Sequence, residues 1–170
     1  MSSEESICPD CGGELRHRDW KPRIVKWYNG RKQHLLIQRL QCVKCHHLHN
    51  ELPDIITPHK HYAAEVIENV VDEVSTPDDE STLCSPCERT MERWKQWIRL
   101  NKTQVDGHLK SVGTRLFGLS REFLNSDKSL LDELRSFGAG WLSIITHVIY
   151  NSGGRMLSVR PPDDFAPALP

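Results

Sequence analysis

Two pairs of cysteines constrain this sequence more than any other feature. Cys8 and Cys11 stand near the amino terminus, and Cys42 and Cys45 follow after about 30 further residues. Zinc prefers four thiolate or imidazole ligands in a tetrahedron, and two Cys-x-x-Cys pairs supply four sulfurs. We therefore interpret these cysteines as the ligands of one structural Zn²⁺ ion, with a redox-active dithiol as the alternative. Because four sulfurs fill the coordination shell, such a metal has no open position for catalysis.

The segment between the two pairs predicts a β-hairpin. Residues 23–28 are rich in β-branched and aromatic side chains, the dipeptide Asn29-Gly30 is typical of a tight turn, and residues 33–41 return as a second strand. This hairpin would carry the second cysteine pair back to the first. Residues 1–50 are therefore predicted to form a zinc ribbon.

The turns that hold the cysteines need residues that accept a positive φ angle. Gly12 and Gly13 follow Cys11, where the backbone amides must turn toward the sulfurs. In the second turn His46 stands where glycine is common. We expect the second turn to be a small departure from the usual pattern.

The remainder of the chain predicts helices. After a connector at 51–57, residues 58–101 are predicted to form a helix-turn-helix and residues 102–152 a C-terminal helical segment, followed by a disordered, proline-rich tail at 153–170. The expected fold class is α+β: a small N-terminal zinc-ribbon β-hairpin followed by an all-α helix-turn-helix and C-terminal helices.

Local start signals predict the limits of the helices. Three Thr-Pro or Ser-Pro dipeptides place a proline at the first position of a helix, which its fixed φ angle favours. The helices expected from these signals are 58–74, 77–83 and 86–100. Further along, Ser126 and Asp127 are expected to cap one longer helix that includes Ile149 and ends before Gly153-Gly154.

Charge is distributed unevenly, although the formal net charge is only −1. Residues 14–44 contain nine basic residues and two acidic ones, whereas residues 51–80 contain nine acidic residues and one basic one. This asymmetry indicates electrostatic polarity between parts of the chain, and solvated charged faces are the simpler explanation of it. If nucleic acid binds, the candidate contact residues are Arg89, Thr90, Arg93, Lys95 and Arg99 on the third helix and Arg23, Lys26, Arg31 and Lys32 on the hairpin.

Neither a secretion signal nor a membrane span is predicted. Residues 1–6 are short, polar and acidic, and the most apolar stretch, 137–150, is too short to cross a bilayer. We therefore expect a cytoplasmic protein without a membrane partner. In that reducing compartment the cysteines bind metal rather than form disulfides.

Two other groups of metal-ligating residues have no recognised spacing. The histidines at 46, 47, 49, 59 and 61 are interpreted as polar residues of the connector region. Cys84 and Cys87 are interpreted as small residues that fill the turn of the helix-turn-helix. The alternative is a second metal site that combines these two cysteines with His59 or His61.

Several motifs resemble a bacterial family of proteins that have an amino-terminal zinc ribbon and a helix-turn-helix related to the recognition ends of insertion-sequence transposases. The motifs are CPDCGG at 8–13, CVKCHHLHNELPD at 42–54, PHKHY at 58–62, RTMERWKQW at 89–97 and Gly140-Trp141. Within them, residues 90–94 resemble the start of a transposase recognition helix, although Cys87 stands where serine is usual. The resemblance spans about three quarters of the chain. It implies a mobile-element context.

The function expected from these patterns is that of a zinc-stabilised DNA-binding protein without catalytic activity. It would act on double-stranded DNA as a transcriptional regulator or a mobile-element accessory. One alternative is a zinc-ribbon adaptor whose C-terminal helices bind a protein partner or form a homodimer. Another is a metal-dependent nuclease or transposase fragment, but 170 residues are too few for a transposase catalytic domain beside these modules.

Overall fold

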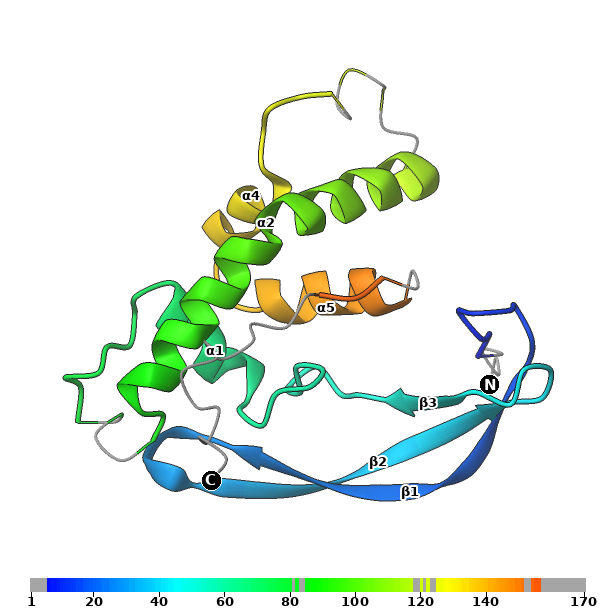
Figure 1. The fold of residues 1–170 in the computed structure, drawn as a ribbon, viewed down its shortest axis with the longest axis horizontal. Helices are drawn as coiled ribbons and strands as arrows, with labels where there is room; N and C mark the ends of the chain where they lie inside the picture. Colours follow the sequence, from blue (N-terminus) through cyan, green and yellow to red (C-terminus); the bar gives the residue numbers. More distant parts are fainter. Residues whose placement is uncertain are drawn as a thin grey trace, which may run out of the picture.

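The computed structural model has strands in its first third and helices after them (Figure 1). It describes residues 6–80, 82, 85–117, 120, 122, 125–151 and 154–156. Within these residues, a three-stranded antiparallel sheet precedes four helices. The predicted α+β class is therefore confirmed.

The sheet consists of strands β1 (Leu15–Lys26), β2 (Lys32–Cys42) and β3 (Leu48–Glu51), in that order. The hairpin, as we call residues 15–42, is longer than predicted, because β1 begins well before residue 23. Its turn is at the predicted dipeptide, where Asn29 and Gly30 have φ angles of 54° and 70°. Strand β3 was not expected, and it pairs with β2 because the chain reverses direction after Cys45.

Helix α1 (Ala64–Val71) is shorter than the predicted helix 58–74. Its start is delayed because the preceding backbone pairs with the end of β1. The N–H of Lys26 donates to His61 O at 2.7 Å, and the N–H of Ala63 donates to Lys26 O at 3.0 Å. The helix ends early because Glu73 adopts a φ angle of 60°, which a continuing helix cannot accommodate.

The short helix predicted at 77–83 is wrong for the part of that segment that the structure describes. Asp79 Oδ2 accepts the N–H of Thr76 at 2.6 Å, and the Thr82 hydroxyl donates to Thr76 O at 2.6 Å. Such side-chain bonds give the backbone an alternative to a helix. Residues 72–87 therefore separate α1 from the next helix, whereas a helix-turn-helix has a turn of three or four residues.

Helix α2 (Glu88–Phe117) is continuous through residues 101 and 102, where we had predicted the end of one helical unit and the start of another. The buried Asn101 does not interrupt it, since its side-chain amide donates to Trp97 O, one turn earlier, at 2.8 Å. The polar residue therefore satisfies its hydrogen bond within the helix.

The single C-terminal helix that we predicted is instead two helices, α4 (Leu130–Ser136) and α5 (Trp141–Asn151). Ser129, rather than Ser126, is the N-cap of α4, and its hydroxyl accepts the N–H of Asp132 at 3.1 Å. Gly138 and Gly140 interrupt the helix because their φ angles are 116° and 97°. Most of the predicted tail, namely 153 and 157–170, lies outside the described residues.

One hydrophobic core joins the hairpin to the helices. Its members include Val25 and Ile37 of the hairpin, Ile67 and Val70 of α1, Met91, Trp94 and Trp97 of α2, Leu131 of α4, and Trp141 and Ile145 of α5. The hairpin turn also contacts the residues just before α2, because the N–H of Asn29 donates to Ser85 O at 3.2 Å. No helix among the described residues is long and apolar enough to cross a bilayer.

Candidate metal centre

The four cysteines predicted as ligands lie together at the end of the sheet opposite the hairpin turn (Figure 1). All four sulfurs are within 4.8 Å of one another. Cys11 Sγ is 3.4 Å from Cys42 Sγ, and Cys8 Sγ is 3.7 Å from Cys45 Sγ. A tetrahedron of sulfurs at about 2.3 Å from a zinc ion has edges of about 3.8 Å. The cluster can therefore hold one metal ion between two turns.

The two turns have matching backbone geometry. The residue four positions after the first cysteine of each pair has a positive φ angle, which is 69° at Gly12 and 59° at His46. In each turn this residue donates its N–H to that cysteine's carbonyl, Gly12 to Cys8 O at 2.9 Å and His46 to Cys42 O at 3.0 Å. The second turn therefore has the same backbone conformation as the first, and it departs from the usual pattern only in having histidine in place of glycine at position 46.

Gly13 allows the two turns to approach each other closely. A Cβ atom at this position would lie 2.8 Å from Lys44 Cβ, 3.0 Å from Cys42 Sγ and 3.4 Å from Cys11 Sγ. Atoms at the first of these distances clash, so a larger residue would force the turns apart. Gly12 and Gly13, predicted together, thus have different roles: one permits a φ angle and the other permits a contact.

Backbone amides and burial shift the thiol pKa values in opposite directions. The N–H of Cys45, together with that of Lys44, lowers the pKa of the Cys42 thiol to about 6. The N–H of His47 also lowers the pKa of Cys45, but burial and the neighbouring thiols raise it to about 12. Thiols packed this closely resist joint ionisation, and a bound cation removes that resistance.

Two histidines and an acid surround the cluster, and sequence reasoning had placed both histidines in a plain connector. His49 Nε2 is 3.3 Å from Cys8 Sγ, and His47 Nδ1 is 2.8 Å from Asp10 Oδ2. The hydrogen bond with His47 lowers the pKa of Asp10. Strand β3 places His49 there, so the residue could be found only once that strand was known. His59 lies elsewhere, with its ring 6.1 Å from that of Tyr150.

Cys87 is exposed and does not fill a turn as predicted. It precedes α2, and its carbonyl accepts the N–H of Thr90 at 2.8 Å. The Thr90 hydroxyl, 3.2 Å from Cys87 Sγ, lowers the pKa of this thiol. Cys84, its predicted companion, lies outside the described residues.

The residues predicted to contact nucleic acid fall into two groups. Some are exposed near the hairpin turn and on α2, and others interact with partners within the molecule. Arg31 and Lys32 are exposed at the hairpin turn, where the Arg31 guanidinium lies 5.1 Å from the centre of the Trp27 ring. The turn touches the chain just before α2, and Arg89 and Arg93 are exposed on the first turns of that helix. Arg99 is exposed further along the same helix. Other predicted contacts have partners within the molecule: Lys95 pairs with Glu73 at 3.1 Å, Arg23 donates to Lys60 O at 2.8 Å, and Lys26 Nζ is 5.7 Å from the centre of the Tyr62 ring.

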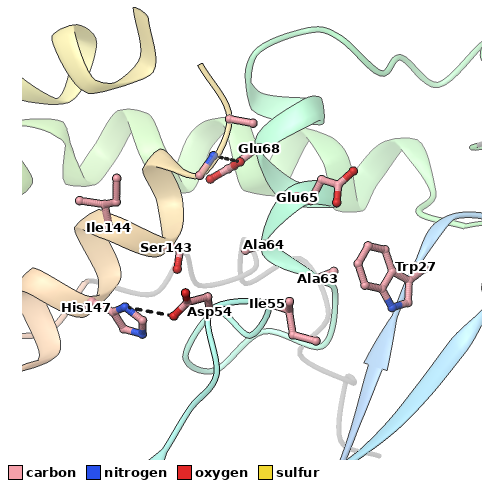
Figure 2. A pocket seen from close by; sticks show the side chains of 12 residues that line it. Trp27, Asp54, Ile55, Ala63, Ala64, Glu65, Glu68, Ser143, Ile144 and His147 are labelled. Carbon is pink, nitrogen blue, oxygen red and sulfur yellow. Dashed lines mark hydrogen bonds and ion pairs between the residues drawn. The ribbon is translucent and has the colours of Figure 1, made fainter. Parts of the chain in front are cut away.

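A cleft of about 550 Å³ lies between the connector, α1 and α5 (Figure 2). Asp54 and His147 face each other across it, with Oδ1 and Nδ1 3.6 Å apart. Glu68, in its wall, is buried and accepts the N–H groups of Gly140 at 2.8 Å and Leu142 at 2.6 Å. Its carboxylate therefore holds the start of α5 in place.

Asp72, one turn after Glu68, holds the same region. Its Oδ2 accepts the indole N–H of Trp141 at 2.7 Å, and its Oδ1 accepts Arg135 Nε at 2.7 Å. Sequence reasoning had counted both acids among the acidic residues of 51–80. In the sequence, the signals that these two acids hold the start of α5 were their spacing of four residues and the dipeptide Gly140-Trp141.

The fold and the cysteine cluster define a small α+β protein with a four-cysteine centre at one end of its sheet. The chain belongs to the family described as domain of unknown function DUF6431, whose model matches residues 8–94, just over half of the 170 residues. The match includes both cysteine pairs, the hairpin and the first turns of α2. Neither curated proteins nor solved structures gave a match to the chain.

Proposed function

We propose that this protein is a zinc-stabilised DNA-binding protein that contacts duplex DNA with the hairpin turn and the start of α2. The observation that carries the proposal is the contact between Asn29 and Ser85, which joins the two sets of basic residues at one end of the molecule. The metal centre lies at the other end of the hairpin. Its role is therefore to fix the ribbon and not to touch the DNA.

Zinc is the metal that the donor set favours. Four thiolates are soft ligands, and tetrahedral S₄ sites select zinc or iron–sulfur chemistry over the hard cations. The sulfur separations of 3.4 and 3.7 Å match the edges of a single-ion tetrahedron. When bound, zinc supplies folding free energy by linking two turns that are distant in the sequence.

The electrostatics of the α2 end support an anionic partner. The Lys60 ammonium group is 4.2 Å from the centre of the Trp97 ring, and both its burial and the charge of Arg93 lower its pKa. Lys60 and Arg93 therefore repel each other near the start of α2, whose first turns also carry the exposed acids Glu88 and Glu92. Phosphate groups that bind there would relieve this repulsion, and phosphate contacts supply most of the non-specific affinity of proteins for DNA.

In this proposal, α2 takes the place of a recognition helix, without the tight turn of a helix-turn-helix. Its exposed Arg89 and Arg93 are on its first turns, where residues of a groove-binding helix reach base edges. The resemblance to transposase recognition modules supports a role as a transcriptional regulator or mobile-element accessory.

Binding of a labelled DNA duplex at graded salt concentration tests the proposal. We expect the affinity of the zinc-loaded chain to fall steeply between about 50 and about 200 mM salt, because counterions compete for the phosphates. In Arg93→Glu, the affinity should fall and the salt slope should decrease by about one. Anisotropy of the labelled duplex measures both quantities.

Arg115→Glu is the matched control, because it makes the same charge change on an exposed residue near the other end of α2. The two arginines are 22 residues apart, or about 33 Å along the helix. The control should lose much less affinity than Arg93→Glu. Absence of duplex binding at low salt, or equal losses in the two variants, would contradict the proposal.

A further inference from the structure

We propose that the outer face of the hairpin binds single-stranded nucleic acid by stacking an unpaired base on Trp20. The outer face consists of Trp20, Pro22, Ile24, His34 and Leu36. The inference deepens the proposed function and rests on it, because both require a polyanionic nucleic acid as the partner. It adds a second surface, separate from the hairpin turn and the start of α2.

Strand register places these residues on one face. Trp20, Pro22 and Ile24 alternate along β1, so their side chains point to the same side of the sheet. Their partners on β2 are Gln38, Leu36 and His34. Val25 and Ile37, on the opposite side, are buried in the core.

The outer face exposes three large apolar side chains to solvent. Trp20 is 56% exposed, Ile24 is 43% exposed and Leu36 is 69% exposed. A cluster of large apolar side chains on a single surface marks a binding site more often than single exposed residues do. Trp20 lies beside the His17 ring, with the centroids 5.5 Å apart, so two aromatic rings occupy adjacent positions.

The charge of the hairpin favours an anionic partner, and Glu51 of β3, which is paired with Gln38, is the acid beside Trp20 on the outer face. The hairpin has one acidic residue, Asp19, and its carboxylate is bound by Arg39, with Nε 2.5 Å from Oδ1. The basic residues of the hairpin are Arg16, Arg18, Lys21, Arg23, Lys26, Arg31, Lys32 and Arg39. The exposed Lys32, which register places on the outer face, has no ion-pair partner in the described part of the chain. A second copy of the hairpin would be repelled by this charge.

Among anionic partners, a nucleic-acid strand fits better than an acidic peptide. Single-strand-binding surfaces combine a basic track for the phosphates with aromatic side chains on which bases stack. The outer face has this combination, since register places the indole of Trp20 and the imidazole of His34 on the same side of the hairpin as the exposed Lys32. From Pro22 to the turn the sheet is only two strands wide, because β3 pairs only with residues 38–41 of β2, and this part offers a narrow surface suited to one strand of nucleic acid.

Anisotropy of a dye-labelled oligothymidine, with the full zinc-loaded chain, tests this inference. Trp20→Ala should weaken binding about tenfold, because base stacking on an aromatic ring is lost. Trp20→Phe should restore most of the affinity, because it keeps a ring. The salt slope should be the same in all three proteins, since the phosphate contacts remain. Phe137→Ala is the matched control, because Phe137 is 86% exposed but lies at the end of α4. It should bind as the parent does.

The same variants with duplex DNA separate this inference from the proposed function. Trp20→Ala should leave duplex affinity within about twofold, because the stacking surface needs an unpaired base. If Trp20→Ala binds oligothymidine as the parent does while duplex binding persists, the inference is wrong and the proposed function stands. If polyglutamate displaces the oligothymidine as effectively as unlabelled oligothymidine does, and depends equally on Trp20, the face binds an acidic polypeptide and the inference is also wrong.

Discussion

At the scale of single residues, the metal centre depends on backbone conformations that its residue types do not all favour. His46 holds a φ angle of 59° although only glycine adopts that region without cost. His46→Gly should therefore stabilise the zinc-loaded protein by about 1 kcal/mol. The midpoint of urea unfolding, at unchanged m value, measures this gain.

The neighbouring His47 gives the control for that prediction. Its side chain is exposed like that of His46, but it makes the 2.8 Å hydrogen bond with Asp10 and has no positive φ angle. His47→Gly should lower the stability, because it loses this contact and gains backbone freedom in the unfolded chain. Equal effects of the two substitutions would show that the φ angle of His46 carries no strain.

Close approach at Gly13 gives a second prediction at this scale. Gly13→Ala should weaken zinc binding about tenfold, because the new Cβ would meet Lys44 Cβ at 2.8 Å beside the sulfurs. Competition with a chromophoric chelator measures the affinity. Gly30→Ala is the control, because its φ angle of 70° is also positive but no atom lies within 4 Å and the metal is at the other end of the hairpin. It should lower stability without a comparable change in zinc affinity.

At the scale of elements, the buried Glu68 joins α1 to the start of α5. Glu68→Ala should destabilise the protein by about 3 kcal/mol, because the N–H groups of Gly140 and Leu142 would lose a charged acceptor and Leu142 is buried. Urea unfolding measures the change. Glu65→Ala is matched to it, being an exposed glutamate one turn earlier on the same helix. It should alter stability by less than about 0.5 kcal/mol, and a similar loss in both variants would contradict the assigned role.

The helical conformation of α2 beyond Asn101 can be tested at Gly107. Because this glycine is inside the helix and a Cβ there would meet nothing within 4 Å, Gly107→Ala should stabilise the protein by about 0.5–1 kcal/mol. Thermal unfolding measures the gain. An unchanged or lower stability of Gly107→Ala would contradict the helical conformation of α2 at this position.

How far each element could be predicted depends on the range of the interactions that define it. The turn at Asn29-Gly30 is local chemistry, and the prediction was right. The start of α1 could not be predicted, because Lys26, distant in sequence, holds residues 61–63 in an extended conformation. The helix at 77–83 was wrong because Thr82 bonds back to Thr76 O, which a start signal alone does not reveal.

At the scale of the whole molecule, the cluster of four cysteines was predictable and the packing of the hairpin against the helices was not. Cysteine spacing alone identified the four residues that cluster. The sequence also suggested separate small modules, but Val25 and Ile37 of the hairpin share one core with Trp94 of α2 and Ile145 of α5. The described residues therefore form a single packed unit across the boundaries predicted at 50/51 and 101/102.

This shared core determines what metal removal should do. Chelation of zinc should lower the melting temperature by about 6–12 °C, since each kcal/mol lost shifts the melting temperature of a protein of this size by about 2–4 °C and the expected loss is about 3 kcal/mol. The far-UV circular dichroism of the helices and the tryptophan fluorescence should still change together, because the hairpin and helices share one core. Cys42→Ser should reproduce the effect of chelation, whereas Cys87→Ser should not, because Cys87 lies outside the four-sulfur cluster. Helices that melt at the same temperature with and without zinc would show that the hairpin and the helices are independent units.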